Sequence, residues 1–188
     1  MKVFVIRHGE SETNKQGLWT GWLDTPLTEK GRADALLARD LLRGVSFDRV
    51  FASDLSRAID TARIVLPDCE YEATPLLREV NVGNIAGKPL GVIKSDDGRL
   101  MNANGYGEFG GESYTEFATR ISEFKSRLES LECDRVALFS HAGVMKGFLR
   151  SVTGVAQLGE KILCKNCAVA IYEYENGEWS LHSWINLY

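Results

Sequence analysis

Three short apolar runs in this sequence are each followed at once by polar residues suited to binding an anion. The runs and the residues behind them are 3–6 before Arg7-His8, 50–52 before Ser53-Asp54 and Arg57, and 136–139 before Ser140-His141. Short apolar runs predict buried strands, and ligands of open α/β sheets lie just beyond the carboxyl ends of their strands. If the three strands are parallel neighbours, two imidazoles and two guanidiniums converge on one crevice. The sequence therefore predicts an α/β fold with a site for an anionic group at one edge of its sheet.

Stretches with helical spacing of apolar residues alternate with these predicted strands. A helix is expected from its N-cap Thr28 to about Arg43, with Ala33, Leu37 and Leu41 on one face. Three further helices are expected from Leu55, Ala58, Ile59, Ala62 and Val65; from Phe117, Ile121, Phe124, Leu128 and Leu131 behind the capping box Ser113-Tyr114-Thr115-Glu116; and from Met145, Phe148, Leu149 and Val152.

The pattern as a whole fits one domain. Apolar alternation on both sides of Asn176-Gly177 predicts a closing hairpin. We expect residues 1–188 to form a three-layer α/β/α sandwich with a mostly parallel central sheet. Residues 84–112 are irregular and longer than most plain connections, so a lid or pocket wall is expected there.

Composition limits the classes of partner. The formal net charge is −4, so the chain lacks the basic face that a nucleic acid or an anionic membrane requires. A strand that begins near the N-terminus leaves no room for a signal peptide, and no apolar stretch is long enough to span a membrane; a cytoplasmic location is expected. Only Cys164 and Cys167 have C-x-x-C spacing, with no second pair beside them, so all four cysteines are expected to be reduced thiols.

Residues 7–14, Arg-His-Gly-Glu-Ser-Glu-Thr-Asn, resemble the signature of the histidine phosphatase superfamily, which includes the cofactor-dependent phosphoglycerate mutases. Further matches recur along most of the chain. The resemblance implies that His8 is the nucleophile of a phosphoryl transfer, that Arg7, Arg57 and His141 neutralise the transferring group, and that Asn14 donates to it. Two arginines with bidentate reach can replace the magnesium that many such enzymes use, so no metal or other cofactor is expected.

Three further segments, 76–83, 19–22 and 109–113, resemble the same family. Residues 76–83 resemble the segment that supplies the acid for the leaving group, and the match falls on Glu79. Residues 19–22 resemble the mutase segment in which a Thr-Gly pair contacts the substrate, so Thr20 and Gly21 are expected to bind substrate.

The chain departs from the mutases where they clamp a second anionic group of the substrate. Val80 and Val82 stand at positions that are basic or tyrosine in mutases, and no Arg-Arg pair occurs in the chain. We therefore expect a metal-independent phosphomonoesterase acting on a small phosphorylated metabolite. A phosphoglycerate mutase is the first alternative, favoured by Thr20-Gly21 and opposed by the two valines and the short segment before Gly110. A non-catalytic phospholigand-binding module is the second, disfavoured because it would need neither a nucleophile nor an acid. The substrate and the oligomeric state stay open.

Overall fold

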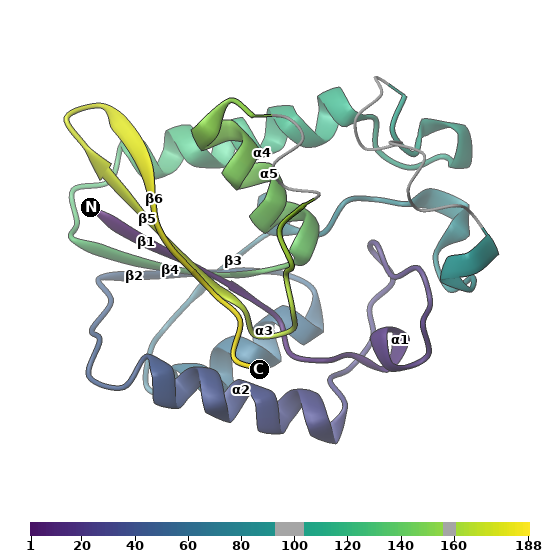
Figure 1. Ribbon diagram of the computed structural model, residues 1–188, viewed down its shortest axis with the longest axis horizontal. Coiled ribbons are helices and arrows are strands. Elements are labelled where there is room, and N and C mark those ends of the chain that lie inside the picture. The colour runs from purple at the N-terminus through teal and green to yellow at the C-terminus, as the bar shows by residue number, and fades with distance from the viewer. Residues whose placement is uncertain (93–103, 156–160) are drawn as a thin grey trace.

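The computed structural model describes residues 1–92, 104–155 and 161–188, which form a layered α/β fold around one sheet (Figure 1). Its strands are β1 (Lys2–Arg7), β2 (Arg49–Ser53), β3 (Glu72–Thr74), β4 (Arg135–Ser140), β5 (Val169–Glu175) and β6 (Glu178–Ile185). They lie in the order β3-β2-β4-β1-β5-β6; β3, β2, β4 and β1 are parallel, and β5 runs antiparallel to both β1 and β6. The prediction of a mostly parallel sheet is confirmed.

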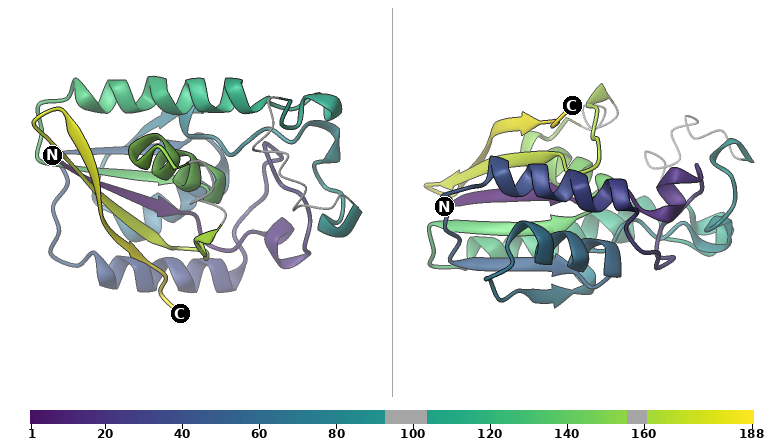
Figure 2. Two further views of the ribbon diagram at one scale, coloured as in Figure 1. Left: turned by 45° about the horizontal axis from the view of Figure 1, so that its top comes forward. Right: turned by 90° about the horizontal axis from the view of Figure 1, so that it is seen from below.

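Helices cover both faces of this sheet, as Figure 2 shows. The helices are α1 (Glu12–Lys15), α2 (Glu29–Leu41), α3 (Ser56–Val65), α4 (Tyr114–Glu129) and α5 (Ala142–Thr153). One core lies between the sheet and α4 with α5, and a second lies between the sheet and α2 with α3. Strand alternation feeds both: Val3 and Val5 enter the α4/α5 core, while Phe4 and Ile6 enter the α2/α3 core.

The chain leaves neighbouring strands toward opposite faces, which opens a crevice at their carboxyl ends. β1 and β4 are paired so that Arg7 lies opposite Ser140. After β1 the chain passes to α2 on one face, whereas β4 runs directly into α5 on the other. Ligands of open α/β sheets bind where connections diverge in this way. His8 and His141 are the next residues along each strand and therefore lie together at this point.

Most predicted helices are confirmed, but the apolar face of α2 is not the face that the helix buries. Leu37 is 50% and Leu41 41% exposed, and Ala33 is exposed as well. The helix instead buries its small residues, Gly31, Ala35 and Ala38, together with Asp34. A Cβ on Gly31 would lie 2.1 Å from the carbonyl oxygen of Glu10, so this helix approaches the backbone after β1 too closely for leucines to fit between them. Close approach of backbones, and not apolar periodicity, decides which side faces inward.

The hairpin is confirmed at Asn176-Gly177, where both residues have positive φ, at 54° and 85°. Residues 84–112 form short 3-10 turns where they are described, at Gly83–Ile85, Leu90–Val92 and Gly107–Phe109. The middle of the expected lid or pocket wall, 93–103, lies outside the described residues. Within the described ranges, no helix has both the length and the apolar character needed to cross a membrane.

The two cysteines of the C-x-x-C motif enter different cores. Cys164 packs in the core under α5, with its Sγ 3.6 Å from Sδ of Met145, whereas Cys167 packs in the α2/α3 core. All four cysteines are free thiols. Burial raises the pKa of Cys164 to about 11 and that of Cys167 to about 12. Both thiols are therefore protonated near neutral pH and do not attack as thiolates.

Candidate active site

The imidazole of His8 is oriented by backbone contacts on both sides of the crevice. Its backbone N–H donates to the carbonyl of Ser140 over 2.9 Å, which ties the end of β1 to the end of β4. Its Nδ1 lies 2.6 Å from the carbonyl oxygen of Gly9. Because a carbonyl can only accept, Nδ1 carries the proton and Nε2 keeps a lone pair. A neutral imidazole whose Nε2 carries no proton can act as a nucleophile.

Gly9 is the residue that this geometry requires. Its N–H donates to Oγ1 of Thr61 in α3 over 3.0 Å. A Cβ on Gly9 would lie 2.3 Å from the carbonyl oxygen of Gly31 in α2, so no other side chain fits. The carbonyl that selects the tautomer of His8 is thus fixed by two helices.

Arg57, the second residue of α3, is fully buried beside His8. Its Nε donates to Nε2 of His8 over 3.3 Å, and its two terminal nitrogens donate to the carbonyls of Leu23 and Gly21 at 3.0 and 2.8 Å. Burial lowers the pKa of Arg57 to about 10, which leaves it cationic at neutral pH. None of these three partners is an anion, so the charge is available to a ligand.

Two polar atoms beside this cation have no hydrogen-bond partner among the described residues, namely Nε of Arg7 and Nδ1 of His141. Arg7 donates from its Nη1 to the carbonyl of Cys164. His141 is fully buried, with its Nε2 2.9 Å from Oγ of Ser53, and the centroids of its ring and the His8 ring are 5.1 Å apart. Buried polar atoms are nearly always paired in native structures. Two unpaired ones beside an arginine that makes no hydrogen bond to a carboxylate indicate a site that an anion completes.

Burial and nearby cations favour the neutral form of both histidines. Burial, followed by the charges of Arg57 and Arg7, holds the pKa of His8 well below its ordinary value of 6.5. Burial, Arg57 and His8 do the same for the pKa of His141. His8 therefore has a nucleophilic lone pair at neutral pH. An anion bound beside both rings would favour protonation of His141, because opposite charge favours the charged form.

The carboxylate of Glu79 reaches the same crevice from an irregular segment after β3. One oxygen accepts from the N–H of Val80 over 2.8 Å, and the other accepts from the N–H of Gly143 over 3.1 Å. Gly143 lies in the first turn of α5, directly after His141 and Ala142. A Cβ on Gly143 would lie only 2.0 Å from Oε1 of Glu79, so the glycine makes room for the carboxylate.

These groups open onto a cavity of about 470 Å³. It is lined by Arg7, His8, Arg57, Glu79, Asn14, Thr20 and Gly21, which were predicted, and also by Leu18, Trp19, Val80, Val82, Leu90, Tyr106, Ala142, Gly143, Lys146 and Asn166. His141 stands behind this described lining. The structure thus brings seven of the eight predicted site residues to one cavity wall and places the eighth beneath it.

The predicted binding residues contribute in different ways. Oδ1 of Asn14 accepts from the backbone N–H of Ser11 and from Nδ2 of Asn166, so its amide nitrogen is the group left to donate into the cavity. Oγ1 of Thr20 lies 2.7 Å from Oγ1 of Thr13. Gly21 has a φ of 50°, and its carbonyl holds Arg57. Gly21 therefore acts on the site by placing a cation.

The sequence profile of the histidine phosphatase superfamily (branch 1) matches residues 3–187. The chain belongs to this superfamily. It is 35% identical over 153 residues to the adenosylcobalamin/alpha-ribazole phosphatase of Salmonella typhimurium, covering 77% of this chain and 76% of the relative. It is 28% identical to the "Probable phosphoglycerate mutase GpmB" of Salmonella choleraesuis over 98% of this chain and 90% of the relative.

A solved phosphatase structure has the same fold over nearly its whole length. The crystal structure of the alpha-ribazole phosphatase from Shigella flexneri superimposes with a TM-score of 0.86 at 28% identity and covers 100% of this chain and 97% of that one. The relatives include both phosphatases and mutase-like proteins. They establish the fold and the family, and they divide between the two activities.

Two polar residues of this histidine phosphatase site were missed in the sequence. Lys146 lines the cavity from the second turn of α5, and Nδ2 of Asn166 donates to the carbonyl of His8 over 3.1 Å. The sequence could have indicated Lys146, because this residue stands five positions after His141 in a helix that begins at the crevice. Asn166 lies in a loop between two cysteines, and no local pattern marks it.

Proposed function

We propose that this protein is a metal-independent phosphomonoesterase that transfers the phosphoryl group of a small phosphorylated metabolite first to His8 and then to water. One observation carries the proposal. Nε2 of a neutral, buried His8 lies 3.3 Å from Nε of Arg57, whose hydrogen-bond partners among the described residues are all uncharged. A nucleophile beside a cation that no carboxylate binds directly suits attack on a phosphate.

The residues account for each step of such a reaction. The lone pair of Nε2 forms a bond to phosphorus while the bond from phosphorus to the ester oxygen breaks, and the carboxyl group of Glu79 gives its proton to that oxygen. The proton on Nδ1 stays in its hydrogen bond to Gly9 and stabilises the positive ring. In the second half, water attacks phosphorus, its proton returns to Glu79, and the bond to Nε2 breaks to release phosphate.

Arg57 and Arg7 supply the charge that the equatorial oxygens of the transferring group require, and this is the basis for expecting no metal. Asn14 adds a neutral donor. His141 contributes its unpaired ring nitrogen from beneath the cavity lining.

The apolar wall of the cavity favours hydrolysis over phosphoryl return. Val80 and Val82 are buried and line the cavity together with Leu18, Leu90 and Trp19. A charge-assisted contact contributes about 1.5–3 kcal/mol, so a small phosphoglycerate without such contacts would leave before the phosphoryl group is returned to it. A larger or less polar alcohol would pack against this wall instead.

A phosphoglycerate mutase is the second candidate, and Lys146 is the observation that favours it. This lysine adds a third cation to the wall and has no ion-pair partner among the described residues, so it offers one anchor for a second anionic group. A mutase must hold the released product long enough to rephosphorylate it. One flexible lysine provides less of a hold than a set of arginines does.

Trapping the intermediate tests the proposal. The protein is mixed with p-nitrophenyl phosphate and quenched, and an acid-labile phosphate is expected on His8 by mass spectrometry; His8→Ala is expected to fold normally and to hydrolyse nothing. A phosphate on serine or cysteine, or turnover by His8→Ala, would contradict the mechanism. Absence of both label and turnover in the wild type would favour a binding module. Incubation with 3-phosphoglycerate and a bisphosphoglycerate primer separates the enzyme candidates, because isomer formed faster than free phosphate would identify a mutase.

A further inference from the structure

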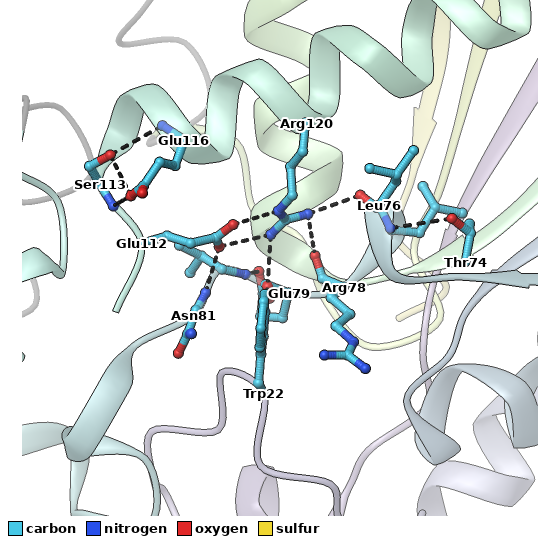
Figure 3. A network of polar contacts seen from close by, with 12 residues as sticks. Trp22, Thr74, Leu76, Arg78, Glu79, Asn81, Glu112, Ser113, Glu116 and Arg120 are labelled. Atoms are coloured by element: carbon cyan, nitrogen blue, oxygen red, sulfur yellow. Dashed lines mark hydrogen bonds and ion pairs between the residues drawn. The ribbon is translucent and has the colours of Figure 1, made fainter. Parts of the chain in front are cut away.

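We propose that Arg120, held by Glu112, is the residue that positions Glu79 for proton transfer. The inference rests on the proposed function, because it concerns the acid of that reaction. Both residues lie outside the cavity, in and just before α4, and their side chains meet the segment that carries Glu79 (Figure 3).

The segment that carries Glu79 is held by side chains from other elements. Between β3 and Val80 the chain makes one short 3-10 turn, Pro75–Leu77, and no strand pairing. The carbonyls of four consecutive residues, 76 to 79, each accept a hydrogen bond from a distant side chain. Three of these four bonds come from Arg120, and the fourth comes from Ser140.

The guanidinium of Arg120 fits this role geometrically. Nη1 donates to the carbonyls of Leu76 and Arg78 at 2.9 and 2.7 Å, and Nη2 donates to the carbonyl of Glu79 at 2.8 Å. A planar fork with five donors can serve several fixed acceptors at once, which a lysine ammonium on a flexible stem does less well. The backbone on which Glu79 is mounted therefore takes its shape from one side chain.

Glu112 holds Arg120 in place and also binds the backbone that follows Glu79 and Val80. Its two oxygens accept from Nε and Nη2 of Arg120 at 2.6 and 3.0 Å, and the two side chains are only 11% and 12% exposed. Glu112 also pairs with Asn81 twice: its Oε2 accepts from the Asn81 N–H over 2.7 Å, and its own N–H donates to the Asn81 carbonyl over 2.8 Å. The backbone is thus fixed on both sides of Glu79 and Val80.

The proper placement of the carboxylate depends on this support. Its oxygens accept from the N–H groups of Val80 and Gly143, and these bonds require it to lie close against the backbone of Gly143. The approach is so close that a Cβ on Gly143 would overlap one oxygen. Trp22 adds a second donor to the Glu79 carbonyl, with its Nε1 2.6 Å away, from the loop whose carbonyls hold Arg57. Arg120 contacts none of the reacting groups, so it is a positioning residue and acts through Glu79.

The test compares two substrates that need the acid to different degrees. The ester p-nitrophenyl phosphate has a leaving group that departs with little protonation, whereas 2-phenylethyl phosphate releases an alkoxide that requires it. Arg120→Met is expected to lower kcat/KM about 10- to 100-fold on the alkyl ester and less than about 5-fold on the aryl ester, since misplacing a catalytic group by about 1 Å costs about 100-fold. Phosphohistidine should still form from the aryl ester.

A matched control and a double variant separate positioning from a general loss of structure. Arg127 lies two turns further along α4 in an exposed ion pair with Glu72, and Arg127→Met is expected to change both substrates equally and by less than about 2-fold. In a Glu79→Gln background, adding Arg120→Met is expected to lower alkyl-ester turnover by less than about 3-fold, because residues that act as one unit are not additive. If Arg120→Met does not fold, the same comparisons are read from Arg120→Lys, which keeps the charge and cannot reach all three carbonyls.

Equal losses on the two esters, or full additivity with Glu79→Gln, would overturn the assignment of Arg120. Failure of the proposed function looks different, because then the wild-type protein itself forms no phosphohistidine from the aryl ester. Selective loss on the alkyl ester, with phosphohistidine formation intact, supports both.

Discussion

The substitution Gly143→Ala adds a single methyl group and is expected to impair catalysis while leaving the stability of the fold nearly unchanged. Its Cβ position lies 2.0 Å from Oε1 and 3.1 Å from Cδ of Glu79, where ordinary contact begins at 3.4 Å. In Gly143→Ala the carboxylate must therefore move by about 1 Å or more, a displacement that costs about 100-fold when a catalytic group is involved. It also loses its bond to the Gly143 N–H.

The same change should leave the fold intact. Residue 143 has helical geometry in α5, where alanine is favoured over glycine by about 1 kcal/mol. The atoms displaced are the end of a half-buried, rotatable side chain that water can reach, so little packing is lost. We expect the free energy of unfolding to change by less than about 1 kcal/mol, a shift in Tm of roughly 2–4 °C at most for a chain of this size.

The assay measures kcat/KM for p-nitrophenyl phosphate and 2-phenylethyl phosphate beside a thermal unfolding curve. Gly143→Ala should lose about 100-fold on the alkyl ester and far less on the aryl ester, with Tm nearly unchanged. Gly147→Ala, one turn along α5, is the control: its Cβ would lie 2.8 Å from the ring of Phe117. Overpacking of that core should lower stability by about 1–3 kcal/mol and leave the ratio between the substrates unchanged.

Wild-type turnover of the alkyl ester by Gly143→Ala would refute the placement of the acid. An equal loss on both esters would also do so, because it would mean that the methyl group blocks the substrate and not the proton donor.

Three further predictions follow from the same site. Because His8 and His141 are neutral when folded but accept protons below pH 6.5 when unfolded, the free energy of unfolding should fall as the pH is lowered through that value; a flat profile by denaturant titration would contradict their burial as neutral rings. EDTA should leave phosphatase activity unchanged, and loss of activity that a divalent ion restores would show that the arginines do not suffice. Lys146→Met should raise KM for esters whose alcohol carries a second anionic group by about 10-fold, a loss of one charged contact, while KM for 2-phenylethyl phosphate stays the same; parallel changes would remove Lys146 from substrate selection.

The crevice could be predicted from sequence because its groups follow directly from strand ends. His8 and His141 each come one residue after a strand of strongly apolar residues, and parallel pairing of β1 with β4 brings such positions together without any long-range information beyond the order of the strands. Glu79 could not be placed in this way, because its segment has no periodicity. Its assignment depended on family resemblance.

Contacts between backbone atoms of distant segments could not be predicted from the sequence. The buried side of α2 differs from its leucine face because the close approach of Gly31 to Glu10 outweighs the leucine pattern, and helical periodicity contains no information about the distance between two main chains. The network of Arg120 was missed for a similar reason: most of its acceptors are carbonyls, and every residue type has one.

The loop 18–27 contacts both Arg57 and the segment that carries Glu79, so changes in this loop affect both groups. Its backbone carbonyls at Gly21 and Leu23 accept hydrogen bonds from Arg57, and its Trp22 indole donates to the Glu79 carbonyl. Its Leu18 and Trp19 line the cavity. A combinatorial library that replaces the whole loop would therefore exchange specificity and reactivity together. Randomising Leu18 together with Leu90, on separate segments and with no hydrogen bond from either side chain, gives a search for new substrates in which the reaction machinery stays constant.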